Sequence, residues 1–388
     1  MTGPEGHLDR VEEALRHPGS TAPRPWLRIG EVPLPVVSPA RVYVCGITPY
    51  DVTHLGHAAT FVWADAAVKV LRSTGAEVDC CRNVTDVDDV LTAAARERGR
   101  YYDEYAAMQE FLFDRAMRAL RVAPPTHSPR AGEHVDSVIQ LASALLVVGA
   151  AYEREGRVYF RGAQVPDVAG VARDEALELL AAYGQPAGEA GREDPLDVAV
   201  WRPSAAGEPA WPSPWGPGRP GWHAECAAMG LSLLGGCIDI LAGGADLTFP
   251  HHAYQAAIVE AVTGADRFSR ARLPVGTVCI GGAKMAKSTG NLVLVADVLE
   301  KVPAPALRLL LLDRRWAQEW GYDESLLAGA SERLERLYAA AGRPGGEAAT
   351  AEVRLALLAD LDVPTALDVA EDAGGQAARL ALRILSLD

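Results

Sequence analysis

Three side chains that could bind a metal, Cys45, Cys226 and His251, are far apart in the sequence but occupy equivalent places in its pattern. Each ends an expected strand or lies at the start of an expected helix, and the carboxyl ends of neighbouring parallel strands meet at one edge of a sheet. Two thiolates and one imidazole suit zinc, and three protein ligands leave a fourth position open for a substrate. Taken singly, each residue fits a buried core or a structural role better than a metal site.

Two further motifs could bind the phosphates of a nucleotide. The run His54-Leu55-Gly56-His57 lies where a loop enters a helix, and the N–H groups at a helix start attract phosphate. A second loop carries Lys284 and Lys287, in a chain in which lysine is scarce. Mobile ammonium groups of this kind neutralise charge that develops on a triphosphate. Alone, the first motif is compatible with capping or surface histidines, and the second with a solvated turn.

The elements that must position these side chains follow an α/β pattern. An apolar run at 41–45, helical periodicity over 55–74 and a second strand over 77–84 make a βαβ unit, whose first loop lies at the carboxyl edge of a parallel sheet. The pattern resumes with a helix at 223–234, and strands at 237–241 and 275–280 flank a helix at 252–262. We therefore expect a Rossmann-like parallel-sheet catalytic domain that is interrupted by an insertion.

The expected organisation has five parts: an N-terminal lead-in over 1–40, the first half of the catalytic domain over 41–125, an inserted connective region over 126–220, the second half with the lysine loop over 221–303, and a C-terminal helical bundle over 304–388. Helices are expected over 86–119, with an interruption near Gly99, and over 134–149. Between residues 152 and 221 the insertion has one strand candidate, at 158–161, and is otherwise expected to form long loops because it is crowded with Pro, Gly and Trp from about residue 184 onward. No strand is expected after residue 304.

The composition is that of a folded chain, with 388 residues, 49% apolar and 23% charged, and a net charge of −14 that argues against nucleic acid as a partner. No apolar run reaches the roughly 18 residues of a membrane span, and 1–19 carries charges where a signal peptide would be apolar. We therefore expect a cytoplasmic protein without a membrane partner. The remaining cysteines, Cys80, Cys81, Cys237 and Cys279, lie in strand-like runs and are expected in the core.

Several motifs, in one order along the chain, resemble those of the class I cysteinyl-tRNA synthetase family. They are the runs 43–51, 54–57, 83–89, 221–226, 243–252 and 284–288. The resemblance covers about residues 41–312. It implies the class I synthetase type of Rossmann-like catalytic domain, in which the carboxylate of L-cysteine attacks the α-phosphate of ATP, forms cysteinyl-adenylate and releases pyrophosphate.

The resemblance also implies roles for single residues. It implies catalytic roles for His54, His57, Lys284 and Lys287. It implies ATP with Mg²⁺ as a substrate and one zinc ion per chain, which Cys45, Cys226 and His251 hold with the substrate thiolate. The residues that it places around cysteinyl-adenylate are Gly46, Ile47, Thr48, Thr60, Asn83, Val84, Thr85 and Trp222, and those around the nucleoside are Gly244, Ala245, Asp246 and Val278.

The chain departs from the family pattern at three places. Ala286 replaces the middle serine of the lysine loop and leaves both ammonium groups, so activity is expected to survive. The run Ala253-Tyr254-Gln255 lacks the carboxylates that follow the paired histidines in the synthetases, which favours a zinc with three protein ligands. The run 189–195 only loosely resembles the family's ligase pattern, which leaves the acceptor open.

Within the family, the run 45–51 and the short C-terminal segment most resemble the cysteine ligases of mycothiol biosynthesis, which join cysteine to the amine of glucosaminyl-inositol. Residues 323–388 hold six arginines, no lysine and twelve acidic residues, and this charge would repel RNA. We therefore expect a monomeric ligase with a small amino-sugar acceptor, whose amine is deprotonated by an unidentified base for which Asp51 and His57 are candidates.

Four alternatives stay open at this point. The first two are a cysteinyl-tRNA synthetase with a reduced C-terminus and a divergent ligase for another small amine. The third is an inactive paralogue that binds zinc or nucleotide, which the retained histidines and lysines oppose. The fourth is a nucleotidyltransferase, which would not explain the three metal-binding side chains.

Overall fold

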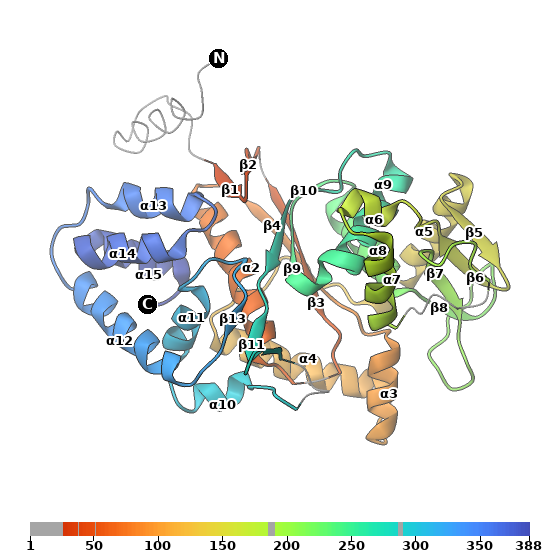
Figure 1. Cartoon of the computed structure of the whole chain (residues 1–388), viewed down its shortest axis with the longest axis horizontal. Helices are drawn as coiled ribbons and strands as arrows, with labels where there is room; N and C mark the ends of the chain where they lie inside the picture. Colours follow the sequence, from red (N-terminus) through yellow and green to blue (C-terminus); the bar gives the residue numbers. More distant parts are fainter. Residues whose placement is uncertain (1–25, 38, 51, 185–190, 286–289) are drawn as a thin grey trace, which may run out of the picture.

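A four-stranded parallel sheet in the order β10-β9-β3-β4 forms the centre of the computed structural model (Figure 1), which describes residues 26–37, 39–50, 52–184, 191–285 and 290–388. Asp51, Ala286 and Lys287 lie outside the described residues. The strands are β3 (Ala40–Ile47), β4 (Val78–Val84), β9 (Ile238–Gly244) and β10 (Ser269–Val275). All three strand pairs are parallel, as the βαβ pattern predicts.

Helices cover both faces of this sheet. Val42 and Val44 of β3 belong to the apolar cluster that contains α2 (Leu55–Ser73), whereas Tyr43 and Cys45 belong to the cluster that contains α8 and α9. Successive side chains of a strand point to opposite faces, so β3 supplies both layers in alternation. The helices of the second layer are α8 (Trp222–Leu234) and α9 (Ala253–Thr263).

The segment between β4 and α8 holds more regular structure than the sequence indicated. Its second half contains a four-stranded antiparallel sheet in the order β5-β6-β7-β8, where one strand and long loops were expected. The strand candidate at 158–161 is confirmed by β6, and β5 pairs with β6 in a short hairpin. β7 pairs with β6 across a long sequence separation, Phe160 with Val198, so local periodicity does not reveal that pairing. The elements are α3 (Asp89–Glu97), α4 (Tyr102–Ala119), η1 (Ala131–Glu133), α5 (Val135–Val147), β5 (Ala151–Arg154), β6 (Arg157–Phe160), α6 (Val165–Ala169), α7 (Arg173–Ala182), β7 (Val198–Pro203) and β8 (Gly218–Pro220).

The expected strand over 275–280 is confirmed only over 278–280, because two strands of different sheets meet in this range. β10 ends at Val275, and β11 (Val278–Ile280) pairs with β12 (Ala283–Lys284) and β13 (Trp320–Gly321) in a three-stranded sheet. Gly276 permits the change, since a Cβ atom there would lie 2.2 Å from the carbonyl oxygen of Gln318. β13 also contradicts the expectation of no strand after residue 304. Cys237 is exposed rather than buried, since it precedes β9 instead of lying within it.

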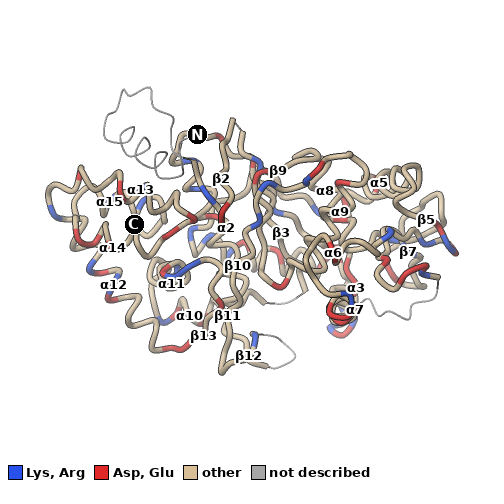
Figure 2. Tube along the Cα trace, turned by 45° about the horizontal axis from the view of Figure 1, so that its top comes forward, with Lys and Arg blue, Asp and Glu red and all other residues tan. Residues whose placement is uncertain are grey.

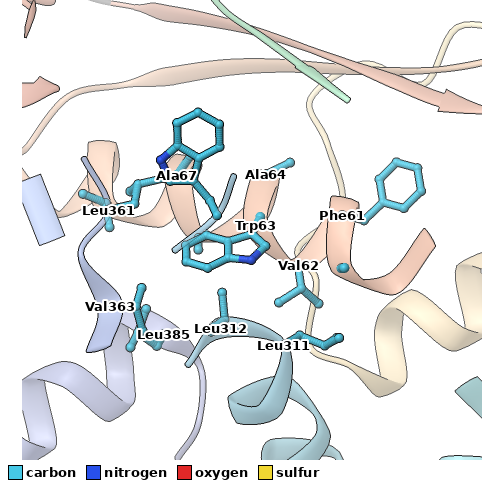
Figure 3. Packing of buried hydrophobic residues seen from close by; sticks show 14 of the residues in the cluster. Phe61, Val62, Trp63, Ala64, Ala67, Leu311, Leu312, Leu361, Val363 and Leu385 are labelled. Carbon is cyan, nitrogen blue, oxygen red and sulfur yellow. The ribbon is translucent and has the colours of Figure 1, made fainter. Parts of the chain in front are cut away.

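Helices form the C-terminal part and pack against α2 (Figure 1). Figure 3 shows Val62 and Trp63 of α2 facing Leu311 and Leu312 of α11, and Trp63 is 1% exposed. The helices are α10 (Val295–Leu299), α11 (Ala304–Leu312), α12 (Ser325–Ala341), α13 (Thr350–Leu358), α14 (Val363–Ala373) and α15 (Gly375–Leu385). A short hairpin of β1 (Leu27–Ile29) and β2 (Val32–Leu34) precedes the central sheet.

None of the described helices combines the length and the apolar character that a membrane span requires.

Candidate active site

A cleft of about 1630 Å³ lies at the carboxyl ends of the central strands. It is the position where open parallel sheets bind ligands, because the loops that leave the strands diverge there. The expected site residues that line it are Cys45, Gly46, Ile47, Thr48, His54, His57, Thr60, Asn83, Thr85, Trp222, Cys226, Gly244, Asp246, His251, Val278 and Lys284. Val84 and Ala245 do not line it, and Lys287 lies outside the described residues.

The three expected metal ligands converge within this cleft. Cys45 comes from β3, Cys226 from α8, and His251 from the turn η3 (Thr248–His252) that precedes α9. Their ligand atoms all lie within 4.8 Å of one another, and all three side chains are buried. The structure therefore brings together two sulfur donors and one nitrogen donor that could hold a metal ion.

The burial of Cys45 and His251 shifts the pKa of each side chain in a way that bears on metal binding. Burial raises the pKa of the Cys45 thiol well above its ordinary value, so a thiolate there needs a cation beside it. Burial, followed by the neighbouring His223, lowers the pKa of His251 well below its ordinary value, which keeps the imidazole neutral. A neutral imidazole and thiolates are the forms in which these side chains bind metals.

Neighbouring side chains orient the three ligands. Nδ1 of His223 lies 3.0 Å from Nδ1 of His251, and the Trp222 ring stacks on the His251 ring with centroids 4.0 Å apart. The amide of Asn83 donates to Sγ of Cys226 at 3.4 Å. Contacts of this kind fix the rings and sulfurs before a metal arrives.

Gln255 is a neighbour of the metal-binding group that the sequence analysis did not assign to the site. Its side chain is fully buried; the Sγ–H of Cys45 donates to Oε1 at 3.6 Å, and Nε2 donates to the carbonyl oxygen of Cys226 at 3.3 Å. Gln255 follows His251 by four residues, and residues four apart on a helix share a face. This four-residue spacing is the sequence feature that could have placed Gln255 near the metal ligands. Gln255 thus links two of the ligands through one amide.

The histidine motif begins α2. His54 is the N-cap, and the Gly56 N–H donates to its Nδ1 at 3.1 Å. The rings of His54 and His57 stack with centroids 3.9 Å apart. Burial, followed by the charge of His54, lowers the pKa of His57 to about 3. His57 therefore favours the neutral form and contributes a hydrogen-bonding group rather than a positive charge.

A close approach of two strands holds the loop after Cys45. The Gly46 N–H donates to Oδ1 of Asn83 at 2.9 Å, and a Cβ atom on Gly46 would lie 1.6 Å from the Asn83 carbonyl oxygen. Only glycine fits there. The hydroxyls of Thr48 and Thr85 lie 2.7 Å apart and link the same two segments farther along the cleft.

Asp246 connects the lysine loop with the inserted region. Nζ of Lys284 donates to Oδ2 of Asp246 at 2.7 Å, and Oη of Tyr183, from the end of α7, donates to the Asp246 carbonyl oxygen at 2.9 Å. The Tyr183 ring also stacks on Trp222. No motif of the sequence indicated Tyr183. The next of the motifs that carry the family resemblance, the run 221–226, begins 39 residues after the end of α7.

Comparison with known proteins shows the family. Residues 36–332 match the model of the class I (C) tRNA synthetase catalytic domain. The chain belongs to this family. A relative from Acidothermus cellulolyticus, named L-cysteine:1D-myo-inositol 2-amino-2-deoxy-alpha-D-glucopyranoside ligase, is 44% identical over 86% of this chain and 84% of its own length. A protein of the same name from Streptosporangium roseum is 40% identical over 92% of this chain and 90% of its own.

Solved structures show the same fold at low identity. A Mycobacterium tuberculosis methionyl-tRNA synthetase in complex with methionyl-adenylate is 16% identical and superposes with a TM-score of 0.63 over 90% of this chain and 82% of its own. The class I synthetase type of α/β fold that the motifs predicted is thereby confirmed, and so is membership of the cysteine-ligase branch of the family.

Proposed function

We propose that this chain is an ATP-dependent, AMP-forming ligase, which activates L-cysteine as cysteinyl-adenylate and transfers it to the amine of glucosaminyl-inositol. The observation that carries the proposal is the shared cleft: the Cys45, Cys226 and His251 group opens into the same cavity as the histidine motif and Asp246. The relatives named as this ligase, at 40–44% identity, support the acceptor.

The metal proposed for Cys45, Cys226 and His251 is one zinc ion per chain, since two sulfurs and one imidazole are donors that zinc prefers. When bound, it supplies a site for the thiolate of cysteine and thereby selection against serine, which packing alone distinguishes poorly. Gln255 and His223 hold the ligands in place. The Trp222 ring stacks on the ring of His251 and lines the cleft.

The residues proposed for adenylate formation line the same cleft as the cysteine site. His54 and His57 at the start of α2 and Lys284 from the lysine loop would contact the triphosphate, with Lys287 as their expected partner. Mg²⁺ would accompany the ATP. Stabilisation of the charge on the departing pyrophosphate is the main contribution that such groups make.

For transfer, the uncharged amine attacks the acyl carbon, a C–N bond forms and the C–O bond to the phosphate breaks. AMP leaves, and the nitrogen gives up a proton to a base, for which Asp51 and His57 remain the candidates. A cysteinyl-tRNA synthetase is the second candidate. The charge of the C-terminal helices opposes it: Figure 2 shows acidic residues interspersed with the arginines along α12 to α15, and residues 323–388 carry a net charge of −6. A monomer in the cytoplasm that binds neither RNA nor membrane stays our expectation.

The test is cysteine-dependent formation of AMP by purified protein, with glucosaminyl-inositol or tRNA as acceptor. The proposal expects stimulation by the amino sugar together with a cysteinyl amide product. Stimulation by tRNA alone would instead support the synthetase. Pyrophosphate exchange with cysteine but no response to either acceptor would point to another small amine.

A further inference from the structure

The order of the central strands lays the subsites of the cleft out in a row. The expected nucleoside residues Gly244 and Asp246 follow β9, which pairs with the edge strand β10. Cys45 belongs to β3, the next strand, so the cysteine site lies beside the nucleoside site. β4 is the opposite edge, and its carboxyl end continues the same cleft away from the nucleotide.

The cleft continues beyond β4, past the residues that are expected to bind cysteine and the nucleotide. Its lining there is Asp88 and Asp89 at the start of α3, together with Arg202 of β7 from the inserted sheet. Thr85, at the end of β4, lies between these residues and the cysteine site. Besides ATP and cysteine, the ligation needs an acceptor amine within reach of the acyl carbon. This arm of the cleft is next to the cysteine site and is not occupied by the expected ATP or cysteine residues.

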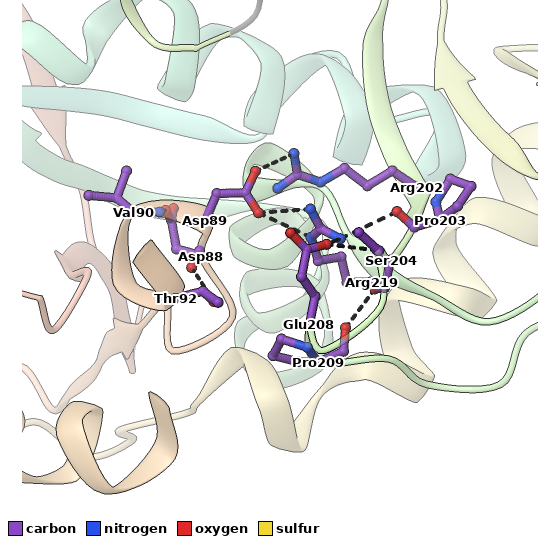
Figure 4. A network of polar contacts seen from close by, with 11 residues as sticks. Asp88, Asp89, Val90, Thr92, Arg202, Pro203, Ser204, Glu208, Pro209 and Arg219 are labelled. Carbon is purple, nitrogen blue, oxygen red and sulfur yellow. Dashed lines mark hydrogen bonds and ion pairs between the residues drawn. The ribbon is translucent and has the colours of Figure 1, made fainter. Parts of the chain in front are cut away.

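Ion pairs hold the arm in shape. Asp89 accepts from Arg202 at 2.8 Å and from Arg219 at 2.9 Å, and Arg219 continues to Glu208 at 2.5 Å. Figure 4 shows Asp89 between the two guanidinium groups, which tie α3 to the inserted sheet. Asp89 therefore has a structural role, since its carboxylate pairs with both arginines. Asp88, which shares the arm, accepts from the Val90 N–H at 2.8 Å through Oδ1.

Arg202 supplies a second sign of a ligand in the arm. Its side chain lines the cleft, and its Nε atom is buried without a hydrogen-bond partner in the described part of the chain. Buried polar atoms of native proteins are nearly always paired, so this atom indicates a polar guest or water that completes it.

We propose that the arm formed by Asp88, Asp89 and Arg202 is the binding site of the acceptor, and that it selects a cationic, polyhydroxylated amine without phosphate groups. This inference rests on the proposed function and adds the place and the chemical class of the second substrate. Asp88 faces the ammonium group, and the Asp89–Arg202 pair offers both acceptors and donors to hydroxyl groups.

The charges in the arm account for this selectivity. Carboxylates at the cysteine end attract an ammonium group and place it near the acyl carbon. The same carboxylates repel phosphate, and the guanidinium groups of Arg202 and Arg219 are already paired with Asp89 and Glu208. A phosphorylated amino sugar or an RNA terminus is therefore a poorer ligand than a neutral amino sugar.

The test uses Asp88→Asn, because asparagine keeps the N-cap of α3 while it removes the charge. The full-length variant is titrated calorimetrically with glucosaminyl-inositol, and its acceptor KM is measured from amide formation. We expect both the Kd and the KM for the amino sugar to rise about tenfold or more, whereas cysteine-dependent pyrophosphate exchange falls far less. Asp103→Asn is the matched control, since Asp103 is an exposed acidic residue in the first turn of α4.

Glucosamine and glucosamine 6-phosphate serve as probes of selectivity on the unmodified protein. The inference expects glucosamine to compete with the acceptor and its 6-phosphate to compete at least tenfold more weakly. An acceptor Kd and KM that are equal in Asp88→Asn and the wild type, with normal exchange, would overturn the subsite alone. Absence of cysteine-dependent exchange in the wild type would overturn the proposed function and the subsite with it.

Discussion

The Tyr183 hydroxyl donates to the backbone carbonyl of Asp246 at 2.9 Å, and the Tyr183 ring stacks on Trp222 with centroids 5.7 Å apart. One side chain of the inserted region thus contacts both the expected nucleoside site and the residue that covers His251. The insertion is therefore part of the cleft. Tyr183 links the position of Asp246, and through it Lys284, to the end of α7.

Tyr183→Phe should weaken ATP binding without loss of metal. The substitution removes the hydrogen bond and keeps the stacked ring, so we expect the KM for ATP in cysteine-dependent exchange to rise about three- to tenfold, the effect of one hydrogen bond. Zinc content and the KM for cysteine should change little. Tyr101→Phe is the control, because Tyr101 is 77% exposed. An unchanged KM for ATP would show that the contact does not position the nucleoside site.

The sequence predicted those helices and strands whose own residues show a β-branched run or a helical periodicity. The β-branched run before Cys45 and the periodicity of Leu55–Ser73 predicted β3 and α2, and the buried pattern of both agrees. In the insertion, the strand candidate at 158–161 predicted β6, but β5, β7 and β8 were not predicted. Val198 and Val200 alternate correctly, but β7 has only six residues and pairs with β6 across a separation of 38 or more residues.

The candidate site shows the same division. Cys45, Cys226 and His251 follow strands or begin helices, so their convergence follows from the sheet. Tyr183 and Arg202 reach the cleft only because the insertion folds back over the sheet, which is a tertiary relationship. The lowered pKa of His57 was equally inaccessible, since it depends on burial rather than on residue type.

Replacement of one metal ligand should remove the metal and the selection of cysteine together. In Cys226→Ser the hydroxyl is a poor zinc ligand, so we expect less than about a tenth of the wild-type zinc content and a KM for cysteine raised at least tenfold. Serine-dependent exchange should rise relative to that with cysteine. Cys237→Ser is the matched control, because Cys237 is an exposed cysteine away from the cleft. Full zinc occupancy with normal cysteine activation in Cys226→Ser would contradict the assignment.

The buried imidazole of His57 should make stability depend on pH. Its pKa is about 3 in the folded protein and 6.5 as the ordinary value, so between these limits the unfolded chain binds the extra proton. The free energy of unfolding should therefore fall as pH decreases from 6.5 towards 3, by at most about 1.4 kcal/mol per pH unit from this residue.

His57→Gln removes that contribution, because glutamine does not titrate. Urea unfolding at pH 5.0, 6.0 and 7.0 should show a flatter decline in the variant, while above pH 7 the two curves should run parallel. Identical slopes for the variant and the wild type between pH 5.0 and 6.5 would mean that His57 titrates near its ordinary pKa in the folded protein.

A buried ion pair joins the C-terminal helices to α2, the helix that begins with the histidine motif. Arg308, fully buried in α11, pairs with Asp65 of α2 and donates to the carbonyl oxygens of Leu120 and Leu385 at 2.9 and 2.5 Å. Lys69 also pairs with Asp65 at 2.6 Å. Removal of one partner would leave a buried carboxylate with less compensation, together with two orphaned carbonyl groups.

Arg308→Met should thus lower the free energy of unfolding by about 3–5 kcal/mol, measured by guanidinium denaturation. The double variant with Asp65→Asn should lose less than the sum of the two single losses, because no unpaired carboxylate remains beside Lys69. Arg336→Met is the control: Arg336 is 55% exposed in its pair with Glu371, and its loss should cost less than about 1 kcal/mol. If Arg308→Met were no more destabilising than Arg336→Met, the buried pair would not be what holds the C-terminal helices against α2.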